Sequence, residues 1–367
     1  MNEFRSGTKI LVQKGSMGGR VIYTATLTLR EANSIIPPHP ESGSLDSREQ
    51  RITDPQHAED IARYIDEVPD YFLPGLMAFL HRDPEFEPLT VDGKVITDKI
   101  GFIWVDARIA RSLGDGMHRG VGIERQLAAH DDEENEKADD TIVVSFIVEA
   151  DRDKRRQAFN DVNRTQKPVP KSLGVSYDMR DPIAIAVNHT VEDHRLGQLI
   201  EREKGTAGRT SGKLTTTGTL FDAVSIVTYG WSGKPGRRKG RVSQDEANTA
   251  AELLVEFVTS VKDIAEVLDK PDSELADAAN ELRTRSILGS GATVKALAGA
   301  LFTILSRCDG DVEAARATFK KLDELDWAPA EWVSIGFVPE GGKTPHSRAQ
   351  EVRAAGLHIA DHLMPVT

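Results

Sequence analysis

The residues best suited to chemistry stand together in the segment 115–120, which reads DGMHRG. A strand-like stretch precedes this segment and a helical pattern follows it, so the segment spans the start of a helix. Backbone N–H groups at a helix N-terminus carry partial positive charge, and a glycine such as Gly116 lets an anion approach the backbone closely. Arg119 can grip a phosphate through two parallel hydrogen bonds, and His118 adds a further donor. The segment therefore predicts a site that binds phosphate or a nucleotide.

Asp115 opens the same segment and admits two interpretations. A carboxylate beside bound phosphate can hold a divalent ion or orient an attacking water, which makes Asp115, His118 and Arg119 candidate catalytic residues. The simpler interpretation is that Asp115 caps the helix and that the glycines form a turn. The residue types alone leave both interpretations open.

A second polar block, 157–173, reads QAFNDVNRTQKPVPKSL. Its asparagines and arginine fall on the last turns of a helix expected over 152–163, and its two lysines flank a proline-stiffened turn. These groups can meet phosphate, so the block is predicted to form the other half of the site. The alternative is that Asn163 ends the helix and that the lysines are solvated. The candidate phosphate ligands of the block are Asn160, Asn163, Arg164, Lys167 and Lys171.

A basic segment, 231–241, reads WSGKPGRRKGR and contains five basic residues and no acid. Its composition suits an arm that contacts the DNA backbone or a narrow minor groove. The alternative is an exposed linker between two lobes, because surface loops are often basic without binding anything. The candidate DNA-binding residues are Lys234, Arg237, Arg238, Lys239 and Arg241.

Length and charge restrict the class of protein. The chain has 367 residues, more than the ~250 to 300 at which one core stops growing, so two lobes are expected. A formal net charge of -12 excludes nucleic-acid coating through the overall field but allows a local basic patch. We expect no membrane span, no signal peptide and no disulfide, since Cys308 is the single cysteine. A cytoplasmic protein is predicted, and the acidic block 131–140 is interpreted as a solvated loop with no metal ligands.

The elements that must position these residues change in kind along the chain. Alternating or apolar runs predict strands, and spacing of three to four predicts helices. This pattern predicts an α+β fold, with an α+β N-terminal domain over 1–185, a basic linker or DNA-contacting segment over 186–242, and a mostly helical C-terminal domain over 243–367. The expected strands are 21–29, 99–105 and 141–148; the expected helices are 55–67, one beginning at 115–119, 152–163, one from 243 onward, 274–285 and 291–306.

The two polar blocks together resemble a known family. The segment 115–119 is similar to the DGQHR signature, with Met117 in place of glutamine. The segment 157–173 is similar to the downstream pattern Phe-x-Asp-x-Asn, Lys-Pro and Lys-Ser-Leu of DGQHR-domain proteins, and 177–182 resembles the continuation found in the DndB family. The resemblance covers roughly 100–185 and its motifs agree in order and spacing.

This resemblance carries expectations of its own. It implies a ParB/sulfiredoxin-like fold for the N-terminal domain, and a DNA-binding transcriptional regulator of a gene cluster for DNA phosphorothioation. Related DGQHR sites imply nucleotide hydrolysis, with ATP and Mg²⁺ as cofactors, so an ATPase acting in the DNA modification system is the alternative. Met117 weakens that alternative because a thioether cannot replace the hydrogen bonds of an amide.

The resemblance also implies partners. Double-stranded promoter or operator DNA is the first of these, and other DNA modification proteins are the second. A homodimer would follow if the operator is palindromic. A third, weaker interpretation makes the chain a scaffold that docks modification enzymes through its helical lobe.

Overall fold

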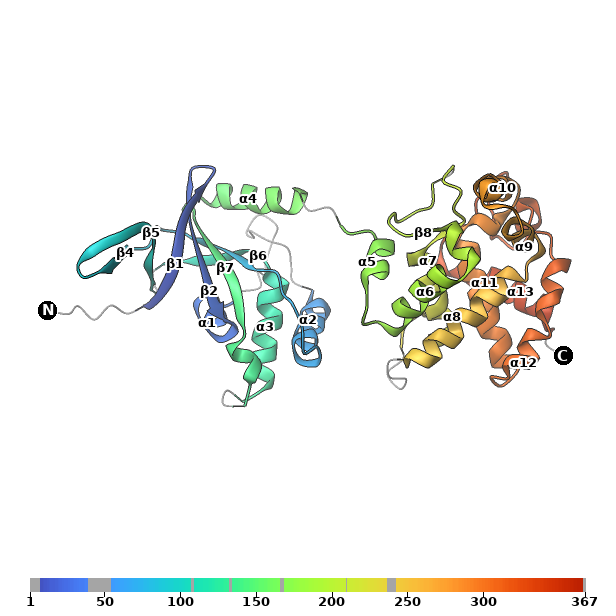
Figure 1. Cartoon of the computed structure of the whole chain (residues 1–367), viewed down its shortest axis with the longest axis horizontal. Helices are drawn as coiled ribbons and strands as arrows, with labels where there is room; N and C mark the ends of the chain where they lie inside the picture. The colour runs from blue at the N-terminus through green and yellow to red at the C-terminus, as the bar shows by residue number, and fades with distance from the viewer. Residues whose placement is uncertain are drawn as a thin grey trace. The chain divides into compact units, whose positions relative to one another are not determined.

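The computed structural model describes residues 7–38, 54–106, 109–131, 134–165, 168–208, 210–235 and 242–365. Its internal contacts divide the chain into two units, Met1–Lys167 and Pro168–Thr367 (Figure 1). We call them the N-terminal unit and the helical unit. The division lies earlier than the expected boundary at 185, because the chain after Pro168 already packs with the later helices.

A seven-stranded mixed sheet forms the N-terminal unit, in the order β4-β5-β1-β2-β7-β3-β6. Strands β3 and β7 pair in parallel and the other pairs are antiparallel. The strand β7 covers the predicted 141–148, and β2 and β5 overlap the other two predicted strands. The strands are β1 (Thr8–Met17), β2 (Arg20–Thr28), β3 (Leu76–Leu80), β4 (Phe86–Val91), β5 (Lys94–Val105), β6 (Arg111–Asp115) and β7 (Thr141–Val148).

One face of this sheet is buried. Alternate side chains of the central strands, such as Tyr23 and Phe146, form a core with helix residues such as Leu29 and Ile123. This alternation is expected of a sheet that is covered on one face. The helical segments are α1 (Leu29–Ile35), α2 (Pro55–Glu67), α3 (Met117–Ala129), the 3-10 helix η2 (Glu136–Asp139) and α4 (Arg152–Thr165).

The helical unit is built around α11, whose side chains are buried on nearly every side. Helices α7 and α13 pack against it (Figure 1). The elements are α5 (Lys171–Tyr177), α6 (Pro182–Asp193), η3 (Arg195–Leu199), β8 (Ile200–Glu201), β9 (Thr215–Thr216), α7 (Thr217–Tyr229), α8 (Gln244–Thr259), α9 (Lys262–Leu268), α10 (Asp272–Arg285), η4 (Ile287–Gly289), α11 (Gly291–Arg307), α12 (Val312–Arg316), η5 (Phe319–Glu324), η6 (Pro329–Trp332) and α13 (Ala349–Leu363).

Trp231, at the start of the basic segment, is half-buried and packs against α11 and α13. A Cβ added to Gly299 would lie 2.0 Å from its ring, and one added to Gly356 would lie 2.4 Å from it. The two glycines therefore make room for the indole between α11 and α13. Glycine inside a helix carries an entropic cost, which the packing of a large aromatic ring offsets.

The expected α+β part followed by a helical part is confirmed at this level. The segment 186–242 is not a stretch between the units, since it contains most of α6 and all of α7, both packed in the helical unit. Among the described residues, no helix combines the length and the apolar character needed to cross a membrane.

Candidate phosphate-binding site

Gly116 stands between strand β6 and helix α3, where it serves as the N-cap of the helix. Its φ of +93° lies in the left-handed region, which side chains with a Cβ rarely adopt. A Cβ added there would also lie 2.7 Å from Leu76 Cδ2 and 3.0 Å from Arg119 Nε. A glycine at 116 is therefore required by the turn and by the position of the Arg119 side chain.

Asp115 and Arg119, four residues apart in the chain, form an ion pair. Arg119 Nη2 donates to Asp115 Oδ2 at 2.6 Å, and the two side chains are only 17% and 32% exposed. Asp115 is the last residue of β6, and among the described residues no side chain accepts a capping hydrogen bond from the first turn of α3, whose N-cap is Gly116. The interpretation in which Asp115 caps the helix is therefore wrong.

His118 joins the starts of two helices. Its Nε2 accepts a hydrogen bond of 3.1 Å from the backbone N–H of Asp54, and Asp54 in turn caps α2. The ring of His57 lies against that of His118, with centroids 4.9 Å apart. His118 thus positions α2 beside the motif.

A cavity of about 670 Å³ joins the two polar blocks that the sequence singled out. It is lined by the whole segment 115–119 and by Phe159 and Asn163 of α4. Phe159 and Asn163 are one turn apart, and Asn163 Nδ2 donates to the Phe159 carbonyl at 2.8 Å. Helix α4 continues past Asn163 to Thr165, so Asn163 does not end the helix. The structure therefore places Asn163 in the same cavity as the first motif.

The other predicted ligands lie elsewhere. Asn160 and Arg164 are exposed on α4 and do not line this cavity, and Lys167 is outside the described residues. Lys171 begins α5 in the helical unit, where it pairs with Asp222. Their predicted roles as phosphate ligands stay predictions.

Asp222 also pairs with Lys295 at 2.6 Å. Burial acts to raise the pKa of the Asp222 carboxyl, but the hydrogen bonds from the two lysines outweigh it and hold the pKa below its ordinary value. Asp222 therefore stays ionised, and Lys171 is not simply solvated as the alternative interpretation held.

The predicted DNA-binding residues fall mostly on a segment whose structure is not described. Lys234 is exposed, while Arg237, Arg238, Lys239 and Arg241 lie outside the described residues. The segment connects α7 to α8, which pack against each other in the helical unit. It is therefore not a linker between the two units.

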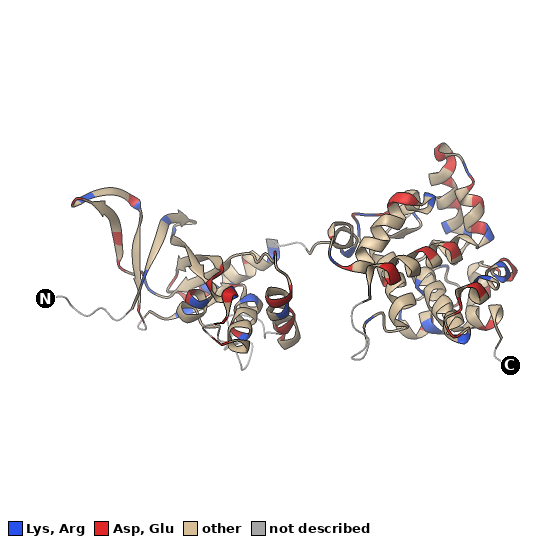
Figure 2. Cartoon of the chain, turned by 60° about the horizontal axis from the view of Figure 1, so that its bottom comes forward, with Lys and Arg blue, Asp and Glu red and all other residues tan. Residues whose placement is uncertain are grey.

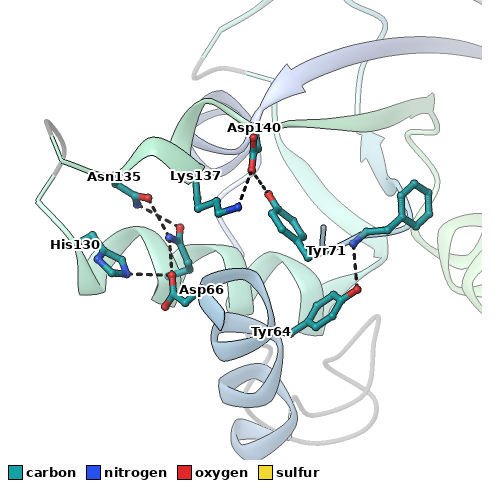
Figure 3. A network of polar contacts seen from close by, with 9 residues as sticks. Tyr64, Asp66, Tyr71, His130, Asn135, Lys137 and Asp140 are labelled. Carbon is teal, nitrogen blue, oxygen red and sulfur yellow. Dashed lines mark hydrogen bonds and ion pairs between the residues drawn. The ribbon is translucent and has the colours of Figure 1, made fainter. Parts of the chain in front are cut away.

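A network of polar contacts fixes the wall of the cavity (Figure 3). The Tyr71 hydroxyl donates to Asp140 at 2.8 Å, and the Tyr64 hydroxyl accepts from the N–H of Phe72 at 3.1 Å. Burial, and then the hydrogen bond to Asp140, raise the pKa of Tyr71, so its hydroxyl keeps its proton. These bonds hold the chain just before Pro74, which lines the cavity together with Gly75.

The same network ties α2 to α3. The Asp66 carboxylate accepts from Gln126 Nε2 and lies against His130 Nε2, each at 3.0 Å (Figure 3). Gln126 also bonds Asn135, which is buried. The acidic block 131–140 is thus in part structural, and its interpretation as a solvated loop is wrong for Asn135, which is buried, while Asp140 is exposed but bonded to Tyr71.

Five residues that line the cavity were not predicted from sequence. Gly75 and Ile61 carry no chemical signal, but Phe159 and Asn163 stand four apart in the Phe-x-Asp-x-Asn pattern, which places them on one helix face. That spacing could have assigned Phe159 to the site. The residues are His57, Ile61, Pro74, Gly75 and Phe159.

Comparison with protein families gives a match over residues 10–353, to the family model DndB, described as DNA-sulfur modification-associated. The chain belongs to the DndB family. The resemblance read from 100–185 thus extends over both units. No curated protein and no solved structure matches the chain. Membership in the DndB family associates the protein with DNA sulfur modification.

Proposed function

We propose that the protein is a DNA-binding transcriptional regulator of a DNA phosphorothioate modification gene cluster, and that its N-terminal cavity is a DGQHR-type site for the phosphate of a nucleotide. The observation that supports this most is the meeting of segment 115–119 with Asn163 in one cavity at the start of α3. The proposal includes a ParB/sulfiredoxin-like fold for the N-terminal unit.

Phosphate binding at this site follows from the donors that the cavity offers. An anion at the N-terminus of α3 meets the positive end of the helix dipole and backbone N–H groups. Arg119 has five N–H donors, and the contact with Asp115 uses one of them. The guanidinium can therefore bind a phosphate while Asp115 still holds it in position.

DNA binding is proposed for the loop 232–241, whose two ends are fixed. Trp231 packs against Gly299 and Gly356 before the loop, and the N–H of Val242 donates to the Tyr229 hydroxyl at 3.0 Å after it. A basic loop with anchored ends loses less freedom on binding than a free arm. Acidic residues are spread over the helices of both units (Figure 2), so a local basic loop is the feature suited to phosphate.

The test is binding of the purified full chain to the promoter DNA upstream of its own gene. Scrambled DNA of equal length is the control, and each binding curve is measured with and without ATP and Mg²⁺. The regulator predicts selective binding to the promoter, and a nucleotide-dependent change would link the cavity to DNA. Equal affinity for the two DNAs would contradict the regulator.

An ATPase in the same system is the second candidate, and the position of Asp115 favours it. Mg²⁺ commonly uses one or two carboxylates together with the phosphates of its nucleotide. Asp115 is the one carboxylate among the described residues that line the cavity. It fits this role once Arg119 turns towards the phosphates. Such an ATPase would release phosphate from ATP only in the presence of Mg²⁺.

The two candidates are separated by Asp115→Asn, which keeps the size of the side chain. An ATPase loses Mg²⁺-dependent phosphate release in this variant, whereas phosphate binding alone is retained because Arg119 is freed from its partner. Circular dichroism of the variant provides the folding control. Release at the wild-type rate would exclude Asp115 from catalysis.

A further inference from the structure

A second cavity, of about 490 Å³, lies in the helical unit where two helices begin. The N-cap of α7, Thr216, and the N-cap of α11, Ser290, both line it. Two helix N-termini that share one cavity add their partial positive charges at the same place. The cavity has the size of a small-molecule site.

Two basic side chains reinforce this charge. Arg283 is fixed at the wall, since its Nη1 donates to the Lys213 carbonyl at 2.9 Å and its Nη2 to the Ala207 carbonyl at 3.2 Å. Lys343 is exposed and also lines the cavity. No Asp or Glu is found among the described lining residues, although the chain carries a net charge of -12.

A buried hydroxyl points to a ligand. Thr215 lines the cavity and is only 6% exposed, yet its Oγ1 has no hydrogen-bond partner. The neighbouring hydroxyls differ, because Thr216 accepts from the N–H of Thr219 and Ser290 accepts from the N–H of Ala292. Buried hydroxyls are nearly always paired in folded proteins. A phosphate oxygen in the cavity would supply the partner that Thr215 lacks.

Glycines keep the cavity open to the backbone. A Cβ added to Gly289 would lie 2.1 Å from Arg283 Cγ, and one added to Gly291 would lie 3.2 Å from Thr219 Oγ1. Gly289 makes room for the Arg283 side chain. Gly291 is the first residue of α11 and leaves space beside Thr219. The absence of a Cβ at the first residue of α11 also leaves its backbone N–H accessible to an anion that enters the cavity.

We propose that this cavity is a second anion site, which binds the phosphate of a nucleotide-sized ester through the N-termini of α7 and α11, Arg283, Lys343 and the Thr215 hydroxyl. The site lies in the helical unit, apart from the DGQHR-type cavity, and does not depend on the function proposed for that cavity. The same chemistry is offered by a free nucleotide and by a phosphate of the DNA backbone.

Thr215→Val and Lys343→Gln in the full chain test the proposal, with ATP and inorganic phosphate as probes in calorimetry and thermal unfolding. Loss of a hydrogen bond or charge contact to phosphate should weaken binding at this site about tenfold in either variant. Thr215→Val should in addition raise the unfolding temperature without ligand, because it removes an unpaired buried hydroxyl. Lys320→Gln, another exposed lysine of the helical unit, is the matched control.

The two sites are distinguished with Arg119→Gln, which alters the N-terminal cavity alone. The second site is supported if the affinity for the probes is kept in Arg119→Gln and falls in Thr215→Val and Lys343→Gln. This outcome does not depend on whether the first site binds phosphate. If a short DNA duplex competes with ATP for the site, the natural ligand is a phosphate of the DNA backbone. If the duplex does not compete, the natural ligand is a free nucleotide. Wild-type affinity for both probes in Thr215→Val and Lys343→Gln would overturn the proposal.

Discussion

At the scale of single residues, the N-terminal cavity depends on a glycine more than on any charged group. Gly116 adopts a φ of +93°, and its missing Cβ leaves the space in which the Arg119 guanidinium lies. Arg119 is held in turn by Asp115 at 2.6 Å. Strain at one backbone position would therefore displace the cation on which phosphate binding is proposed to depend.

Gly116→Ala should lower the free energy of unfolding by about 1–3 kcal/mol, the cost of an unfavourable φ, and should weaken phosphate binding more than that loss explains. Urea unfolding measures the first effect and calorimetry with ATP the second. Gly15→Ala is the matched control, because a Cβ there meets nothing within 4 Å. Unchanged affinity in Gly116→Ala would show that Arg119 tolerates the added methyl group.

The position of the first motif could be predicted from the sequence, and that of the second only in part, whereas the roles of both stay predictions. Asp115, His118 and Arg119 are consecutive or nearly so, and local rules suffice to place them at a helix start. The sequence also assigned Asn163 to the phosphate site, whereas it gave no role to His57. His57 reaches the cavity through the packing of α2 on α3, which depends on the contact of Gly122 with Ile61 and has no local signal.

At the scale of elements, a polar network joins α2, the chain at 71–72 and α3 (Figure 3). It lies next in sequence to Pro74 and Gly75, which line the cavity. Helix α2 was predicted at 55–67 because Asp54 caps it and Pro55 begins it. The short strand β6 was expected only as a strand-like stretch before the motif, without bounds and without a partner strand. Its five residues include a glycine and two charged residues, and their pairing with β3 is a long-range contact. Helix ends are thus readable locally, and sheet neighbours are not.

Tyr71→Phe should reduce the affinity for phosphate because it releases the chain that leads to Pro74 and Gly75. The lost hydrogen bond to Asp140 should cost about 0.5–1.5 kcal/mol in the free energy of unfolding. Tyr23→Phe removes a similar bond to Asp83, of 3.0 Å, away from the cavity. Chemical unfolding and calorimetry of the two variants separate general stability from the site. Equal losses of affinity in both would refute a positioning role for Tyr71.

At the scale of the whole molecule, the distribution of charge decides how an acidic protein can bind DNA. The net charge of -12 repels a polyanion at long range, so attraction must come from a segment that gathers positive charge. The five basic residues of 231–241 are the densest such group in the chain, and the segment contains no acid. Its anchors, Trp231 and Val242, belong to the helical unit.

Replacing the five basic residues of this loop by glutamine should therefore make the salt dependence of DNA binding shallower. The slope of log K against log salt concentration should fall by about 0.9 for each phosphate contact that is lost. Glutamine keeps a flexible polar side chain without the charge, and the packing of Trp231 is untouched, so the unfolding temperature should not change. Lys262→Gln combined with Lys320→Gln, two exposed lysines elsewhere in the helical unit, controls for net charge. A slope equal to that of the wild type would place the DNA contacts outside the loop, and an open face of the N-terminal sheet would become the next surface to test.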